Sequence, residues 1–152
     1  MSSDLCVRYL DGDRFAIDVR GHVLLVDQPV DAGGTDAAPT PTELFVGGLA
    51  SCVAFYARRY LARHKIPSQG LTVSARYDMG GRPNRVRNIG IEIAPPPGLP
   101  PERRAAFLAV ASHCTVHNTL DDPPEVDIVL QEAVSTATNL RGMPSGGQAD
   151  RR

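Results

Sequence analysis

The sequence predicts a single α+β domain in which short strands and helices alternate. Three observations support this prediction: three β-prone runs near the start, one long amphipathic helix after them, and two alternating strands beyond the helix. At 152 residues, with 42% hydrophobic and 22% charged residues, the chain is long enough for one core. We expect the domain to span residues 1–134 and a disordered C-terminal tail to follow at 135–152.

The first part of the chain is predicted to form an antiparallel meander. Three runs rich in β-branched and aromatic residues are expected as strands: residues 7–10, 15–19 and 23–26. Gly12 and Gly21 mark the tight turns between them. Residues 27–41 lack periodicity and are rich in Gly, Pro and Asp, which indicates a long loop of the kind that often has a function.

The longest predicted element is an amphipathic helix over residues 41–65. Thr40 ahead of Pro41, with Glu43 close behind, is a helix-start pattern. Apolar residues then recur at spacings of three and four: Leu44, Phe45, Leu49, Cys52, Val53, Tyr56 and Tyr60. Gly47 and Gly48 inside this helix suggest that another backbone approaches it closely, which makes a dimer plausible.

The rest of the chain is expected to form a hairpin, a second helix, a short helical piece and a last strand. These elements are predicted at residues 71–79 and 86–94, 102–114, 116–120 and 126–130. The order is therefore β-β-β-α-β-β-α-β, with antiparallel sheets around the long helix.

Composition and charge exclude several classes of function. The net charge of -1 gives no electrostatic case for binding nucleic acid or an anionic membrane. No apolar run approaches the roughly 20 residues that cross a bilayer, and the N-terminus lacks the features of a signal peptide, so we expect a cytoplasmic protein. His113, Cys114 and His117 lack a clear fourth ligand, so a metal site is not expected there.

Two of the three cysteines lie at landmarks of predicted helices. Cys52 falls on the apolar stripe of the long helix, and Cys114 lies at the end of the second helix. A cysteine in such a place is most often a small hydrophobic residue, but two of them together suggest a redox pair, which in a reducing compartment would be catalytic or transient. Cys6 has no obvious chemical neighbour and is expected to be structural or an incidental exposed thiol.

The segments PTELFVGGLASC at 41–52 and CTVHNTL at 114–120 resemble the OsmC/Ohr family, which includes osmotically induced protein C and the organic hydroperoxide resistance proteins. The resemblance covers about residues 7–131. It implies an OsmC-like fold, an intertwined homodimer with its active sites at the subunit interface, and no bound cofactor. In the peroxidase members the first cysteine attacks the peroxide and the second resolves the product; the matching residues are Cys52 and Cys114.

Two further site residues follow from the same resemblance. In the peroxidase members an Arg from the early strands lowers the pKa of the attacking thiol, and Arg14 is the best match, with Arg20 as second choice. A Glu orients that Arg from ten positions before the cysteine; here that position is Thr42, and Glu43 lies nine positions before. The alternatives are a solvated strand-end charge for Arg14 and a helix-start residue for Glu43.

The region around Cys114 adds one departure and one candidate. Thr115 replaces the Pro that often follows the second cysteine of the family. His117, three residues after Cys114, is either a base for that thiol or a capping and packing residue.

The resemblance implies a thiol-dependent peroxidase that reduces organic hydroperoxides in oxidative stress defence. A Cys52 sulfenic acid and a Cys52–Cys114 disulfide would be its intermediates, and an external dithiol would reduce the disulfide. The apolar residues around Cys52 favour alkyl or lipid hydroperoxides over hydrogen peroxide. The alternatives are a redox-sensing dimer and a small-molecule-binding dimer without efficient peroxidase activity, because the PTEL form resembles the less characterised OsmC-like branches.

Overall fold

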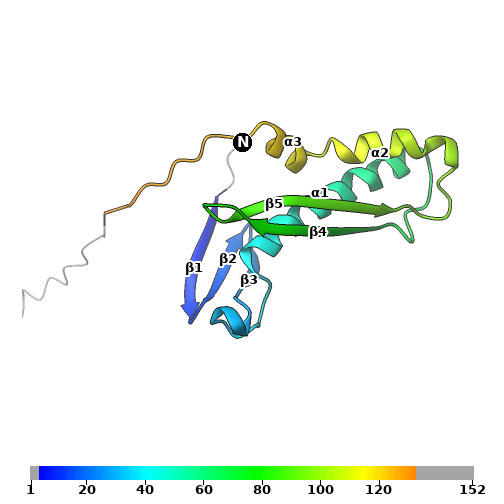
Figure 1. Cartoon of the computed structure of the whole chain (residues 1–152). Coiled ribbons are helices and arrows are strands. Elements are labelled where there is room, and N and C mark those ends of the chain that lie inside the picture. Colours follow the sequence, from blue (N-terminus) through cyan, green and yellow to red (C-terminus); the bar gives the residue numbers. More distant parts are fainter. Residues whose placement is uncertain (1–3, 133–152) are drawn as a thin grey trace, which may run out of the picture.

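The computed structural model of the chain describes residues 4–132, and they form the predicted α+β fold with antiparallel sheets (Figure 1). The tail expected at 135–152 lies outside the described residues. Within residues 4–132, the helices lack the length and apolar character that crossing a membrane would require.

The N-terminal strands form the predicted meander. β1 (Leu5–Asp11), β2 (Arg14–Val19) and β3 (His22–Val26) pair antiparallel in the order β1-β2-β3. Gly12 and Gly21 have φ of 49° and 81° in the two turns, where a residue without a Cβ is favoured. Figure 1 shows this sheet extending away from the rest of the molecule.

One face of this sheet is apolar and exposed. Val7 pairs with Ile17, and Ile17 pairs in turn with Leu24, so these three side chains lie on the same face. The exposed large side chains of this face, which we call the apolar sheet face, are Leu5, Val7, Tyr9, Phe15 and Leu24. An exposed apolar face of this kind usually marks a contact surface for another molecule.

The loop between β3 and the long helix is held by one buried carboxylate, that of Asp27. It accepts hydrogen bonds from the Thr35 hydroxyl (2.6 Å) and from the backbone N–H groups of Gln28, Thr35 and Ala37 (2.8, 3.2 and 3.0 Å). These bonds, the Thr35 hydroxyl first, lower the pKa of Asp27 to about 2. A Cβ at Gly34 would overlap the Gln28 carbonyl, so the two backbone segments of this loop pack directly against each other.

The long helix α1 (Pro41–Arg63) begins as predicted, with a capping box. The Thr40 hydroxyl accepts from the Glu43 backbone N–H (3.1 Å), and the Glu43 carboxylate accepts from the Thr40 N–H (2.7 Å). Gly47 and Gly48 do not meet another backbone within the described chain, because a Cβ at either position would have no neighbour within 4 Å.

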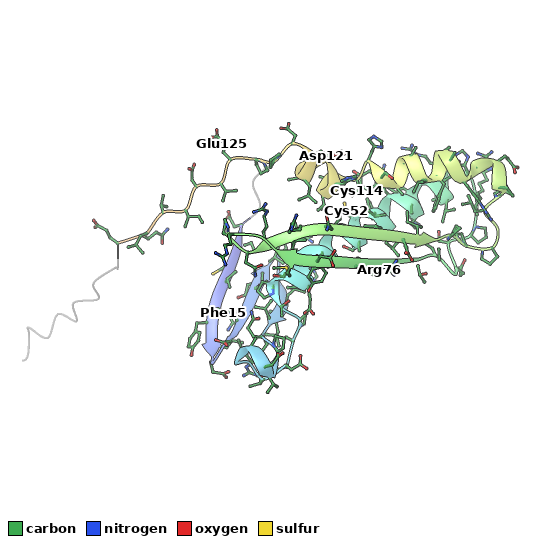
Figure 2. All side chains as sticks on the ribbon, in the orientation of Figure 1. Phe15, Cys52, Arg76, Cys114, Asp121 and Glu125 are labelled. Atoms are coloured by element: carbon green, nitrogen blue, oxygen red, sulfur yellow. The ribbon has the colours of Figure 1, made fainter. Side chains whose placement is uncertain are left out.

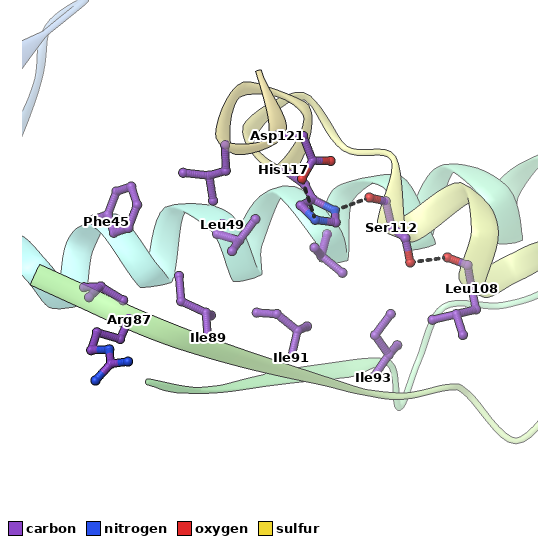
Figure 3. Close-up of a pocket in the computed structure, with 13 residues that line it drawn as sticks. Phe45, Leu49, Arg87, Ile89, Ile91, Ile93, Leu108, Ser112, His117 and Asp121 are labelled. Atoms are coloured by element: carbon purple, nitrogen blue, oxygen red, sulfur yellow. Dashed lines mark hydrogen bonds and ion pairs between the residues drawn. The ribbon is translucent and has the colours of Figure 1, made fainter. Parts of the chain in front are cut away.

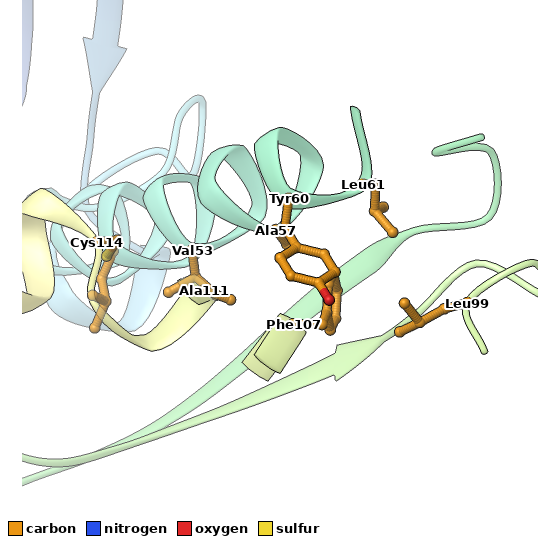
Figure 4. Packing of buried hydrophobic residues seen from close by; sticks show 9 residues of the cluster. Val53, Ala57, Tyr60, Leu61, Leu99, Phe107, Ala111 and Cys114 are labelled. Atoms are coloured by element: carbon orange, nitrogen blue, oxygen red, sulfur yellow. The ribbon is translucent and has the colours of Figure 1, made fainter. Parts of the chain in front are cut away.

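The helices and strands that follow α1 pack around it, and together with α1 we call them the helical body. It contains the hairpin of β4 (Thr72–Gly80) and β5 (Arg85–Ala94), and the helices α2 (Arg104–Ser112) and α3 (Thr115–Asp121). The core lies mainly between α1 and α2 (Figure 4). Its buried residues are Leu49, Val53, Ala57, Tyr60, Leu61, Leu99, Phe107, Ala111 and Cys114.

The last strand, predicted at residues 126–130, is not formed. Residues 123–132 are irregular and pair with no strand among the described residues (Figure 1). Val126, Ile128 and Leu130 are 76%, 92% and 99% exposed. Alternation of apolar residues was the basis of the prediction, but a strand also needs a free sheet edge within reach, and this segment leads away from both sheets.

Candidate active site

Cys52 and Cys114 lie next to each other where α1 passes the junction of α2 and α3 (Figure 2). Cys52 is partly exposed in the middle of α1, whereas Cys114 is completely buried at the N-cap of α3. Both are free thiols. Cys6 is exposed on β1, outside this pair.

The environment of Cys114 keeps its thiol protonated. Burial raises the pKa of Cys114, and the neighbouring Cys52 thiol raises it further. The backbone N–H of His117, 3.4 Å from the Cys114 sulfur, opposes this effect without reversing it. A buried, protonated thiol is a poor first nucleophile, so the more exposed Cys52 is better placed to meet a substrate.

A hydrogen bond between two hydroxyl groups joins the helices that hold the two thiols. The Tyr56 hydroxyl lies 2.8 Å from the Thr115 hydroxyl oxygen. Among the described residues, it is the side-chain hydrogen bond that connects α1 with α3. The sequence pattern gave Tyr56 only a packing role, because nothing local to it indicates that it meets a residue 59 positions away.

The imidazole of His117 stabilises the local helix rather than contacting the Cys114 sulfur. Its Nδ1 forms a hydrogen bond with the Ser112 carbonyl oxygen, and its Nε2 lies 3.8 Å from the Asp121 carboxylate. Only the backbone N–H of His117 reaches the Cys114 thiol. The structure therefore favours the capping and packing role for this side chain.

The other two predicted site residues bind partners of their own. The Arg14 guanidinium forms hydrogen bonds of 2.8 and 2.6 Å with the Asp11 carboxylate at the β1–β2 turn. Glu43 is part of the capping box, and Arg20 occupies the β2–β3 turn with φ of 48°. The described chain thus brings the two cysteines together and leaves the roles of Arg14 and Glu43 as predictions.

A cavity of about 480 Å³ adjoins the cysteine pair, between α1, β5 and the α2–α3 region (Figure 3). Its walls are mainly aliphatic and aromatic, with polar groups at the rim. The lining residues include Phe45, Leu49, Val53, Ile89, Ile91, Ile93, Leu108, Ser112, His117 and Leu120. Neither cysteine lines the cavity, but Leu49 and Val53, which precede and follow Cys52 in α1, both do.

Arg87 lines this cavity at a β-bulge, with its guanidinium pointing away from α1 (Figure 3). Asp78 pairs with Asn88 and Met79 pairs with Val86, so Arg87 has no partner on β4. Val86 and Arg87 then both line the cavity, although consecutive residues of a regular strand point to opposite faces. The sequence pattern did not single out Arg87; the excess of one residue in β5 over β4 is the signal, and it is visible only once the register is known.

Within residues 4–132, no group of three or more His, Cys, Asp and Glu side chains is arranged to hold a metal ion. The arrangement described above is that of a dithiol protein, with one accessible and one buried thiol beside an apolar cavity in an α+β fold.

The chain belongs to the OsmC family. The family described as OsmC-like protein matches residues 34–129, which is more than half of the chain and includes both cysteines of the pair. This confirms the resemblance seen in the two cysteine segments. No curated protein matches the chain.

Solved structures share the fold. A protein from Psychrobacter arcticus 273-4, described provisionally as an osmotic stress induced and detoxification response protein, is 26% identical with a TM-score of 0.70, covering 76% of this chain and 85% of its own. An organic hydroperoxide resistance protein OsmC from Legionella pneumophila is 19% identical with a TM-score of 0.59, covering 79% and 89%. A provisionally named organic hydroperoxide resistance protein from Vibrio cholerae, with captopril in one active site, is 18% identical with a TM-score of 0.60, covering 77% and 83%.

Proposed function

We propose that the protein is a thiol-dependent peroxidase that reduces organic hydroperoxides in oxidative stress defence. The main support is the contact between two free thiols of unequal exposure, Cys52 partly open and Cys114 buried. In such a pair the partly exposed thiol can react with the substrate, while the buried thiol can react only with the neighbouring cysteine.

The proposed reaction transfers one oxygen atom from the peroxide to Cys52. The Cys52 thiolate attacks the terminal oxygen of the hydroperoxide, the O–O bond breaks, and the alcohol leaves after taking up a proton. The Cys114 thiol then attacks the Cys52 sulfenic sulfur, which forms the disulfide and releases water. An external dithiol returns two electrons and two protons, which restores both thiols. A reducing cytoplasm would supply that dithiol.

The cavity supports an organic rather than an inorganic peroxide. Its aliphatic wall runs along α1 on both sides of Cys52, at Leu49 and Val53. An alkyl chain in this space would lose contact with water, which favours the binding of an organic hydroperoxide. Hydrogen peroxide would gain nothing from such a wall.

We also propose that the active protein is an intertwined homodimer. The apolar sheet face is exposed in the single chain, Gly47 and Gly48 leave room beside α1, and residues 126–130 have no strand partner within residues 4–132. A second copy that covers the sheet face and pairs with this segment would satisfy all three features.

Arg14 and Glu43 remain the proposed cation and acid of the Cys52 site. The Arg14–Asp11 pair is exposed, and exposed ion pairs contribute little to stability. Exchange of Asp11 for a different partner in an assembled dimer would therefore cost little. The Glu43 carboxylate is less free, because it would have to leave the capping box.

A redox-sensing dimer is the second candidate. The involvement of Glu43 in helix capping and the presence of Thr42 at the family's acid position favour it, because both weaken the activation of Cys52. A small-molecule-binding dimer would use the same cavity without any thiol chemistry.

Peroxide consumption with dithiothreitol separates these candidates. We expect the wild type to consume cumene hydroperoxide faster than hydrogen peroxide, and Cys52→Ser to abolish this activity. Cys114→Ser should leave a sulfenic acid that dimedone traps and that overoxidises. Cys6→Ser is the matched control, since Cys6 is a free thiol outside the pair, and should retain full activity. Full activity of Cys52→Ser would refute the proposal.

A further inference from the structure

We propose that Tyr56 and Thr115 are positioning residues whose hydrogen bond holds Cys114 against Cys52 and thereby sets the rate of disulfide formation. This inference rests on the proposed redox pairing of the two cysteines. It concerns the second half of the reaction, in which the sulfenic acid is resolved.

The two hydroxyl groups are attached close to the two sulfur atoms. Tyr56 follows Cys52 by four residues in α1, so both side chains leave the helix on the same side, one turn apart. Thr115 follows Cys114 directly and is the first residue of α3. The 2.8 Å hydrogen bond therefore links the two segments within one helical turn of Cys52 and one residue of Cys114.

The position of Cys114 depends on this bond because the backbone changes direction there. Cys114 has extended dihedral angles (φ -79°, ψ 155°) between α2 and α3 and belongs to neither helix. α2 is anchored in the core by the buried residues Phe107 and Ala111, whereas α3 contributes only the partly buried Val116. The His117 imidazole ties α3 to the end of α2, and the Tyr56–Thr115 bond is the side-chain hydrogen bond that ties α3 to α1, the helix of Cys52.

Distance controls the fate of the sulfenic acid. A disulfide forms only when the two Cα atoms lie within roughly 4.4–6.8 Å of each other. If Cys114 attacks, the S–O bond of the Cys52 sulfenic acid breaks, the S–S bond forms, and water leaves with the thiol proton. If α3 moves away, a second hydroperoxide molecule instead oxidises the sulfenic acid to sulfinic acid. The hydrogen bond therefore favours resolution over irreversible oxidation.

The aromatic ring of Tyr56 is held separately from its hydroxyl group. It packs edge-on against Phe55, with centroids 5.7 Å apart, and the Arg59 guanidinium lies 6.0 Å from its centroid. Tyr56→Phe keeps these ring contacts and removes only the hydrogen bond. Thr115→Val removes the same bond from the other side at nearly constant volume.

The test measures disulfide formation directly, with diamide as the oxidant of the reduced, full-length protein. We expect Tyr56→Phe and Thr115→Val each to slow Cys52–Cys114 disulfide formation by about threefold to tenfold, the size of one hydrogen bond. The double variant should be no slower than either single variant, because both remove the same interaction. After cumene hydroperoxide treatment, mass spectrometry should find more sulfinic acid at Cys52 in all three variants.

Two controls separate positioning from a general effect on α3. Thr115→Ser keeps the hydroxyl and should restore the wild-type rate. Thr119→Val is matched in chemistry and helix, but the Thr119 hydroxyl donates to the Thr115 carbonyl within α3, so its loss should leave the rate unchanged. Wild-type rates in Tyr56→Phe and Thr115→Val, or additive losses in the double variant, would overturn the inference.

Because diamide oxidises the thiols without any peroxide, it tests the positioning role of Tyr56 and Thr115 separately from the proposed peroxidase activity. A wild type that forms the disulfide with diamide but consumes no hydroperoxide refutes the peroxidase and leaves the positioning test intact. A wild type that forms no Cys52–Cys114 disulfide with either oxidant refutes both.

Discussion

The N-terminal sheet and the helical body both consist of amphipathic elements, but only the body buries its apolar side. In the sheet, only Ala16 and Val26 are buried, while Leu5, Val7, Tyr9, Phe15 and Leu24 of the apolar sheet face are exposed. In the body, α1 and α2 enclose a continuous cluster that includes Cys114. The strands of the sheet can pair with one another because they are neighbours in the chain. Burying an apolar face also requires a second layer of structure packed against it. The described chain provides such a layer for the helical body but not for the apolar sheet face. The buried thiol, Cys114, thus lies in the region whose core forms within the single chain.

The largest expected difference between the two regions is in the cost of removing one leucine side chain. Leu61 is 0% exposed, so Leu61→Ala should lower the free energy of unfolding by about 2–5 kcal/mol. Leu24→Ala, on the apolar sheet face, should cost less than about 1 kcal/mol in the isolated chain. Urea denaturation at low protein concentration measures both. Equal losses would break the comparison, because Leu24 would then also be buried.

A lysine on either face of the sheet sharpens the comparison. Val7 (54% exposed) lies on the apolar sheet face, and Val23 (56% exposed) lies on the opposite face, where it pairs with Asp18. Val7→Lys should raise the dissociation constant of the proposed homodimer at least about tenfold, since a charge would then be buried in its interface. Val23→Lys should change it little. Sedimentation velocity over a range of concentrations tests both variants, and an unchanged dissociation constant in Val7→Lys would show that the apolar sheet face does not mediate association.

The smallest effect on stability is expected from a substitution in the loop that joins the N-terminal sheet to α1, and it should depend on pH. The pKa of Asp27 is lowered to about 2 in the folded chain, so its contribution to stability is present above about pH 4 and is lost as the pH falls towards 2. Asp27→Asn should therefore be less stable than the wild type at pH 7, with a difference that narrows below pH 4.

The urea midpoint between pH 7 and pH 2.5 measures this difference. Asp31→Asn, at an exposed position in the same loop, should follow the wild type throughout. A difference between Asp27→Asn and the wild type that stays constant with pH would mean that the carboxylate charge is not what closes the loop.

Local chemistry made much of the fold predictable. Thr40 and Glu43 indicated the start of α1, and the capping box confirms it. The meander, the hairpin and both later helices also follow from turns and periodicity within a few residues. The adjacency of Cys52 and Cys114 followed from the family resemblance rather than from any local pattern.

Three features of the structure could not be predicted from sequence patterns, because each depends on a contact with another segment of the chain or on the lack of one. The segment 126–130 alternates like a strand but has no edge to pair with among the described residues. Arg87 lines the cavity at a bulge, which is a property of the register between two strands. The contact between Tyr56 and Thr115 depends on how α3 lies against α1. Each case requires a relation between two segments, whereas periodicity describes only one.

The closed loop around Asp27 has a consequence for the speed of assembly. The hydrogen bonds to Asp27 at one end and the capping box at the other restrict the conformation of the loop that joins β3 to α1. The sheet thus meets any partner already oriented, and little chain entropy is lost on contact. Association would then be limited by the chance that two rigid surfaces collide in the right orientation, at typical rates of about 10⁵–10⁷ M⁻¹ s⁻¹, rather than by folding on the partner. A newly made chain would carry an apolar surface ready to bind, and its time alone in the cell would depend on its concentration.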